Sequence, residues 1–217
     1  MKISEVFESI QGEGKYAGTP VIFVRTSGCT RKCSFCDTAY HIDGTEYIVE
    51  ELAELIKQHK SKIVVWTGGE PLLQLESIIE IGELLPNHIF HLETNGDLIK
   101  PDNVDKLFIL FDYISISPKD LETAKRIYEL LDDNVDTLYD NDYQDFDEEI
   151  SKFDIKVVTD LTVNKELIPY ATILMPLTTY TDNDLEIEKN VWNYCVENNI
   201  KISLRQHVHV WGKSRGK

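Results

Sequence analysis

The sequence predicts an α/β protein, an incomplete TIM-like barrel of about six parallel strands. Short runs rich in β-branched and aromatic residues alternate with longer amphipathic stretches, the pattern of parallel strands joined by crossover helices. The chain has 217 residues, fewer than the ~250 of a full eight-stranded barrel. Polar or glycine-rich peptides follow most of the strands, as they do where loops at the carboxyl edge of a sheet form a site.

The predicted strands are the segments 20–25, 62–66, 88–92, 113–117, 154–158 and 172–175, with a seventh at 201–205. Apolar residues recur at helical spacing over 47–59, 75–85, 121–131 and 184–198. We expect Thr45 to be the N-cap of the first helix, and the second to end before Pro86, because a proline disfavours helix at the preceding residue. No linker or repeat separates these elements, so residues 1–217 are expected to form a single domain.

The net charge is −16, from 38 acidic residues against 22 lysines and arginines. This excess argues against nucleic-acid binding, which requires positive charge to neutralise phosphates. Ten of the acidic residues, and no basic residue, lie between Ile127 and Ser151. The segment 132–149 mixes Asp, Asn and Tyr without helical or strand periodicity, which predicts an irregular loop or insertion. A calcium site is the alternative for so many carboxylates, although the EF-hand spacing is absent.

No apolar run approaches the ~20 residues of a membrane span, and the chain does not begin with the layout of a secretory signal peptide. We therefore expect a cytoplasmic protein with no membrane contact. Of its four cysteines, Cys29, Cys33 and Cys36 lie within eight residues. In a reducing compartment this grouping predicts metal binding or catalysis rather than disulfides. Cys195, on the predicted helix 184–198, is expected to be a buried packing thiol.

The three clustered cysteines have the spacing C-x3-C-x2-C, which lets three thiolates from one loop bind a single inorganic centre. A structural zinc site needs a fourth protein ligand, for which His41 is a candidate. A four-iron cluster held by three cysteines instead leaves one iron able to bind a small molecule, as a catalytic cluster requires. The spacing favours iron–sulfur, with zinc as the open alternative.

This loop, with Phe35 before its last cysteine, resembles the signature loop of radical S-adenosylmethionine (SAM) enzymes, and TGGEP at 67–71 resembles their glycine-rich strand end. Further peptides are similar to the 7-carboxy-7-deazaguanine synthase family: FESIQGEG at 7–14, FVR at 23–25, CDT at 36–38, ETNG at 93–96, SPK at 117–119 and QHVHVWG at 206–212. The resemblance covers residues 6–117 and resumes at Met175 and the tail.

The resemblance implies a radical SAM core and a lyase that converts 6-carboxy-5,6,7,8-tetrahydropterin to 7-carboxy-7-deazaguanine with loss of ammonia, in queuosine or deazapurine biosynthesis. It implies a 4Fe-4S cluster, SAM and Mg²⁺ as cofactors. The cluster would cleave SAM to a 5′-deoxyadenosyl radical, which would remove a hydrogen from C6 of the pterin. The resemblance also implies a homodimer, with reduced flavodoxin or ferredoxin as electron donor.

Individual residues receive roles from the same resemblance, and none is catalytic beyond the cluster and SAM. The metal ligands are Cys29, Cys33 and Cys36 for the cluster and Thr38 for Mg²⁺. The SAM site comprises Phe35, Cys36, Asp37, Gly69, Ser117, Pro118, Lys119, Asp120, Met175, Pro176, Leu177 and Thr178. The substrate site comprises Ile10, Gln11, Gly12, Glu13, Arg25, Thr67 and His207.

Arg25 suits a substrate carboxylate, because a guanidinium offers a bidentate fork that Lys lacks. The alternative is that Arg25 forms a surface ion pair. Glu13 is expected to accept a hydrogen bond from the pterin amino group, and the alternative is a solvent-facing loop acid. His207 or His209 is expected to line the pocket.

Two other functions stay open. One is an activase that installs a glycyl radical on a partner protein, because such activases share the cysteine loop. The other is a non-catalytic zinc or electron-transfer module, which the strand-edge peptides disfavour. Residues 1–40 and 201–217 carry net charges of +1 and +5, so we expect an acidic electron donor to dock near Arg31 and Lys32.

Overall fold

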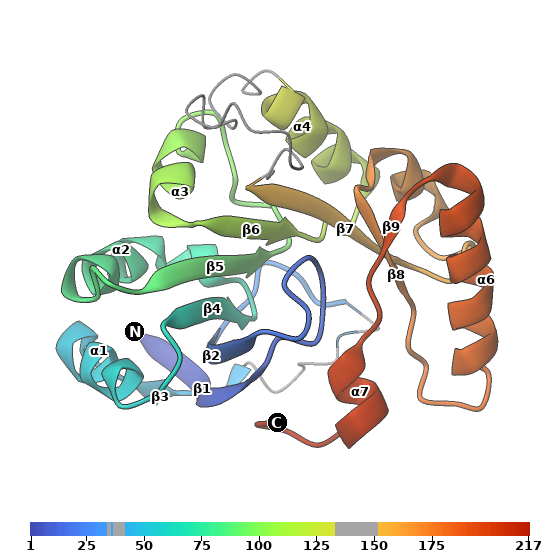
Figure 1. Ribbon diagram of the computed structural model, residues 1–217. Helices are drawn as coiled ribbons and strands as arrows, with labels where there is room; N and C mark the ends of the chain where they lie inside the picture. Colours follow the sequence, from blue (N-terminus) through green and yellow to red (C-terminus); the bar gives the residue numbers. More distant parts are fainter. Residues whose placement is uncertain (34–35, 37–41, 133–151) are drawn as a thin grey trace, which may run out of the picture.

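The computed structural model describes residues 1–33, 36, 42–132 and 152–217. Within these ranges, nine strands form one sheet in the order β3-β1-β2-β4-β5-β6-β7-β8-β9 (Figure 1). The seven parallel strands are β2 (Pro20–Thr26), β4 (Ile63–Gly68), β5 (Ile89–Thr94), β6 (Tyr113–Ile116), β7 (Phe153–Thr159), β8 (Ile173–Pro176) and β9 (Lys201–Ile202). In this described part of the chain β3 and β9 are the two edges of the sheet, so the predicted incomplete barrel is confirmed.

Two strands lie outside the prediction. β1 (Lys2–Ile10) is antiparallel to β2, and β3 (Thr45–Glu46) is antiparallel to β1. The expected N-cap at Thr45 is wrong, because Thr45 belongs to β3 and the helix that follows starts after Ile48 without a side-chain cap. The predicted strand 201–205 is shortened to the two residues of β9, since the chain turns from there into a helix.

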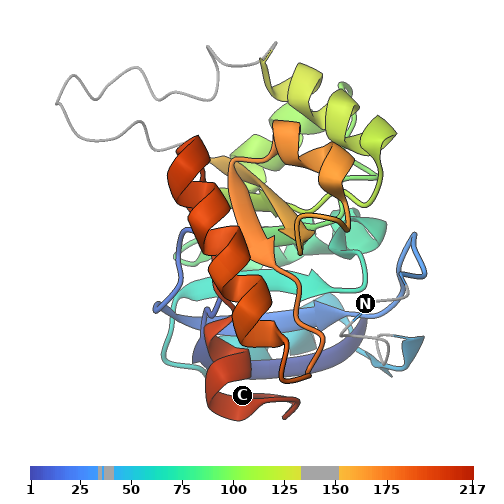
Figure 2. The ribbon, with the colours of Figure 1, turned by 90° about the vertical axis from the view of Figure 1, so that its right-hand side faces the viewer.

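The α-helices are α1 (Val49–Lys57), α2 (Leu75–Leu84), α3 (Val104–Leu110), α4 (Leu121–Asp132), α6 (Asp184–Asn198) and α7 (Gln206–Trp211), with 3-10 helices η2 (Pro71–Gln74) and η3 (Lys165–Tyr170). Helices α1 to α4 lie around the outer side of the curved sheet in Figure 1. Figure 2 shows α6 beside the last strands of the sheet, with α7 following towards the C-terminus. None of the helices in the described ranges is long and apolar enough to cross a membrane.

Alternation along the strands separates a hydrophobic outer layer from a polar interior. On β5 and β7, Leu92 and Val157 belong to the buried core, together with Leu52 of α1. The neighbouring residues Glu93 and Lys156 point the other way and line a cavity inside the barrel. The same pleat that packs the helices therefore directs polar side chains into the interior.

Several expectations fall on residues outside the described ranges. These are the acidic segment with its calcium alternative, which lies almost wholly within 133–151, and the site residues Phe35, Asp37, Thr38 and His41. The prediction that Cys195 is a buried packing thiol is confirmed, since this residue is 3% exposed on α6 within the core. Burial raises the pKa of its thiol.

Candidate functional site

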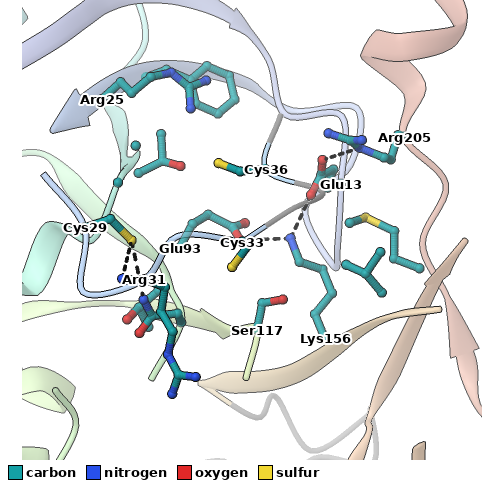
Figure 3. A pocket seen from close by; sticks show the side chains of 18 of the residues that line it. Glu13, Arg25, Cys29, Arg31, Cys33, Cys36, Glu93, Ser117, Lys156 and Arg205 are labelled. Carbon is teal, nitrogen blue, oxygen red and sulfur yellow. Dashed lines mark hydrogen bonds and ion pairs between the residues drawn. The ribbon is translucent and has the colours of Figure 1, made fainter. Parts of the chain in front are cut away.

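A cavity of about 870 Å³ lies inside the barrel, where the carboxyl ends of the strands meet the cysteine loop and α7 (Figure 3). The predicted site residues that line it are Ile10, Gln11, Glu13, Arg25, Cys29, Cys33, Cys36, Thr67, Gly69, Ser117, Lys119, Met175, Leu177, Thr178 and His207. Four described residues of the predicted set do not line it: Gly12, Pro118, Asp120 and Pro176. The structure thus brings residues from the whole length of the chain to one place.

The three loop cysteines form no disulfide and line the wall of this cavity. The Sγ of Cys29 accepts hydrogen bonds from the backbone N–H of Arg31 (3.4 Å) and from Nδ2 of Asn95 (3.8 Å). No three Cys, His, Asp or Glu side chains of the described part approach closely enough to form a metal centre by themselves. Three thiols on one loop, with N–H donors directed at sulfur, nevertheless fit the donor set of an iron–sulfur cluster.

Glycine at position 69 permits the cysteine loop to pack against the end of β4. A β-carbon at Gly69 would lie 1.7 Å from the carbonyl oxygen of Gly28, directly before Cys29. Gly68 has a φ of +117°, a conformation that L side chains rarely adopt. The glycine pair at the end of β4 therefore serves a close backbone approach as well as a turn.

Glu70, the acid of the same TGGEP peptide, links the ends of β4 and β5. Its buried carboxylate accepts hydrogen bonds from Thr94 Oγ1 (2.8 Å), Asn95 N (2.9 Å) and Leu72 N (3.1 Å). Burial raises the pKa of Glu70, although these hydrogen bonds act in the opposite direction. Glu70 thereby fixes Asn95, whose side chain contacts the first cysteine.

The cavity is bordered by a buried charge cluster that sequence reasoning missed. Lys156 of β7, 5% exposed at its side chain, lies 2.7 Å from Glu13 Oε2 and 2.9 Å from Glu93 Oε2. Arg205 Nε donates to the other oxygen of Glu13 (3.1 Å), and Gln11 Nε2 contacts Glu93 Oε1 (3.5 Å). Figure 3 shows Glu13, Lys156 and Arg205 across the cavity from Cys29, with Glu93 between them.

These ion pairs set the charge state of the cluster. Burial alone would raise the pKa of Glu13, but the charges of Lys156 and Arg205 outweigh it and lower that pKa. Burial alone would lower the pKa of Lys156, but the carboxylates of Glu13 and Glu93 outweigh it and raise that pKa above its ordinary value. Glu13 is thus held as a carboxylate at neutral pH. Its side chain is only 17% exposed within this cluster, which excludes the solvent-facing alternative.

Arg25 and Thr67 stand side by side on β2 and β4 and both line the cavity. Arg25 Nε donates to Glu5 Oε2 (3.1 Å), and the arginine side chain is only 17% exposed. The ion pair expected in the alternative reading is therefore present, but at the cavity wall rather than on an open surface.

The chain end closes one side of the cavity. His207 of α7 lines it, with Nε2 3.9 Å from Glu13 Oε1, whereas His209 pairs with Glu188 (3.0 Å). A β-carbon at Gly12 would lie 2.6 Å from His207 Nδ1, so Gly12 contributes by allowing α7 to approach. Lys217 also lines the cavity.

His91, deeper in the barrel on β5, gives the fold a measurable pH dependence. It is 3% exposed and packs against the ring of Tyr16 (4.4 Å between centroids). Burial lowers the pKa of His91 from 6.5 to about 4, with a small opposing effect of Asp112. Between these values the unfolded chain binds a proton that the folded protein does not, so stability falls as the pH decreases from 6.5 towards 4.

We expect His91→Phe to reduce the loss of unfolding free energy between pH 7 and pH 5 by about 1–2 kcal/mol. Urea denaturation of the variant and the parent protein at both pH values measures this difference. An equal loss in the two proteins would contradict the assignment of a neutral, buried imidazole.

A family model described as the radical SAM superfamily matches residues 23–186. Curated relatives described as 7-carboxy-7-deazaguanine synthases include proteins of Hyperthermus butylicus (45% identical, covering 56% of this chain and 53% of that protein), Thermoplasma acidophilum (38%, 66% and 68%) and Halobacterium salinarum (32%, 97% and 90%). The chain thus spans about half the length of the first relative and most of the third.

Solved structures show the same fold. QueE from Escherichia coli is 18% identical with a TM-score of 0.54, and the match covers 95% of this chain and 94% of that one. Native anSMEcpe with bound AdoMet and Cp18Cys peptide is 20% identical with a TM-score of 0.58, over 90% and 66%. The cysteine loop, the strand-edge cavity and these relatives agree: the chain belongs to the radical SAM superfamily and, within it, to the 7-carboxy-7-deazaguanine synthases.

Proposed function

We propose that this chain is a radical SAM lyase that converts 6-carboxy-5,6,7,8-tetrahydropterin to 7-carboxy-7-deazaguanine and releases ammonia. The observation that carries the proposal is that the cysteine loop and a charged, partly polar wall share one cavity. Its volume of about 870 Å³ is in the range of small-molecule sites.

Cys29, Cys33 and Cys36 would hold a 4Fe-4S cluster. SAM would lie beside them, against Gly69, Ser117, Lys119 and the 175–178 peptide. When bound, the cluster and SAM supply a radical able to remove a hydrogen atom from the substrate. The protein orients the reacting carbon and excludes water by enclosing it in the barrel.

The substrate would lie between Arg25 and the buried charge cluster. The guanidinium of Arg25 is suited to the pterin carboxylate. The carboxylates of Glu13 and Glu93 are acceptors for the N–H groups of the aminopyrimidinone ring, and Lys156 pairs with both of them. Gln11, Thr67 and His207 complete the polar wall.

We further propose Mg²⁺ at Thr38, next to the substrate carboxylate, because magnesium prefers hard oxygen ligands. A homodimer and a flavodoxin or ferredoxin donor are part of the same proposal. Arg31 and Lys32 differ as docking residues: Arg31 is paired with Asp97 and Asp120, whereas Lys32 is exposed. Lys32 is therefore the better candidate for contact with an acidic donor.

The test is anaerobic incubation of the reconstituted protein with reductant, SAM, Mg²⁺ and 6-carboxytetrahydropterin. We expect 7-carboxy-7-deazaguanine and one equivalent of ammonia, and neither product when SAM is omitted. Absence of the deazaguanine from a protein with an intact cluster would overturn the proposal and favour the activase.

A further inference from the structure

Arg31, between the first two cysteines, is held by two acids from other parts of the chain. Its Nε and Nη2 donate to the two oxygens of Asp97 at 2.7 and 2.5 Å. Its Nη2 also lies 2.5 Å from Asp120 Oδ2. Arg31 is 28% exposed and Asp97 is 16% exposed at their side chains. A bidentate, largely enclosed pair of this kind is stronger than an ordinary surface ion pair.

Asp97 also fixes the residue before Arg31. Thr30 Oγ1 donates to Asp97 Oδ2 (2.7 Å), and Asn95 Nδ2 donates to Thr30 Oγ1 (2.9 Å). The same Asn95 amide contacts Cys29 Sγ (3.8 Å). Three consecutive loop residues are therefore attached to the peptide that follows β5.

Asp120 attaches the loop to a second peptide. Its Oδ1 accepts from the backbone N–H of Thr123 in the first turn of α4 (2.8 Å), while its Oδ2 faces Arg31. Ser117 and Lys119, just before it, line the cavity where SAM is proposed to bind. Arg31 thus spans the cysteine loop and the proposed SAM-binding peptide.

We propose that Arg31, Asp97 and Asp120 form a clamp that positions the cluster ligands relative to the SAM site. Asp97 sets the conformation of the loop between Cys29 and Cys33, and Asp120 sets its distance from the 117–119 peptide. Asp120 acts through Arg31 rather than by contact with SAM, which explains why it does not line the cavity. This inference rests on the proposed cluster but not on the proposed substrate.

The first test measures iron release from the reconstituted protein to an excess of chelator. We expect Arg31→Gln and Asp97→Asn each to accelerate release about tenfold, because each removes hydrogen bonds between charged groups. The double variant should accelerate release by less than the product of the two single effects, since both changes break the same Arg31–Asp97 pair. Lys106→Gln, which breaks an exposed ion pair with Glu76 away from this cavity, should release iron at the wild-type rate.

The second test separates positioning from general stability. The spectrum of the reduced cluster is recorded by electron paramagnetic resonance while SAM is added. We expect Asp120→Asn to raise about tenfold the SAM concentration at which half of the spectral change has occurred. Its rate of iron release should stay within about twofold of the wild-type rate. Wild-type iron release in both Arg31→Gln and Asp97→Asn, or wild-type SAM dependence in Asp120→Asn, would overturn the clamp.

Discussion

Replacement of Cys33 by alanine is expected to abolish cluster binding and all cleavage of SAM. The loop offers three thiols to the cavity, and two thiolates cannot hold a four-iron cluster. Iron and sulfide per chain, with the visible absorbance after anaerobic reconstitution, measure the effect. We expect less than a tenth of the wild-type iron content.

Cys195→Ala is the matched control for this experiment. It removes one thiol from the core, away from the cavity lining, and should leave the iron content unchanged. Wild-type iron in Cys33→Ala would refute the ligand assignment. Equal loss of iron in both variants would show that the cysteine loop has no special role.

Lys156→Met should lower the unfolding free energy at pH 7 by about 3–5 kcal/mol, because it leaves the carboxylates of Glu13 and Glu93 without their shared buried cation. In the parent protein the pKa of Glu13 is lowered, so its ionised form stabilises the fold above the ordinary value of 4.5. That stability is lost only as the pH falls through the lowered folded-state pKa.

In Lys156→Met, Arg205 still opposes the effect of burial on Glu13 but the lysine no longer does, so the pKa of this carboxyl is higher than in the parent protein. The deficit in stability should therefore be largest at neutral pH and shrink as the pH falls towards 5. Urea unfolding of the parent protein and the variant at pH 7 and pH 5 measures the deficit in unfolding free energy at each pH. A companion variant that adds Glu13→Gln and Glu93→Gln should recover most of the stability, and an equal deficit at both pH values would contradict the account.

The parallel strands could be predicted from the sequence because each is a short apolar run followed by turn residues. β1 was not predicted, because its sequence KISEVFESI alternates polar and apolar residues instead of forming an apolar run. One face of this strand is partly exposed, and it pairs antiparallel to β2. α3 has only seven residues, too few to establish a helical period. Both omissions concern elements whose local signal is weak and whose place depends on tertiary pairing.

The site likewise contains a part that local sequence predicts and a part that depends on the tertiary fold. The cysteine loop and the glycine pair were predictable since their chemistry is contained in a few consecutive residues. The cluster of Glu13, Glu93, Lys156 and Arg205 was not predictable, because only the curved tertiary fold brings these distant positions together. A single local signal existed: Lys156 stands among the apolar residues Ile155, Val157 and Val158 of β7, where an unpaired lysine would be costly.

The most direct measurement uses 6-carboxytetrahydropterin carrying deuterium at C6, incubated anaerobically with the reconstituted protein, reductant, Mg²⁺ and SAM. Mass spectrometry then follows the label and the purine product. The account predicts 7-carboxy-7-deazaguanine, with deuterium in the 5′-deoxyadenosine released from SAM. Cleavage of SAM without deuterium transfer and without the deazaguanine would contradict it.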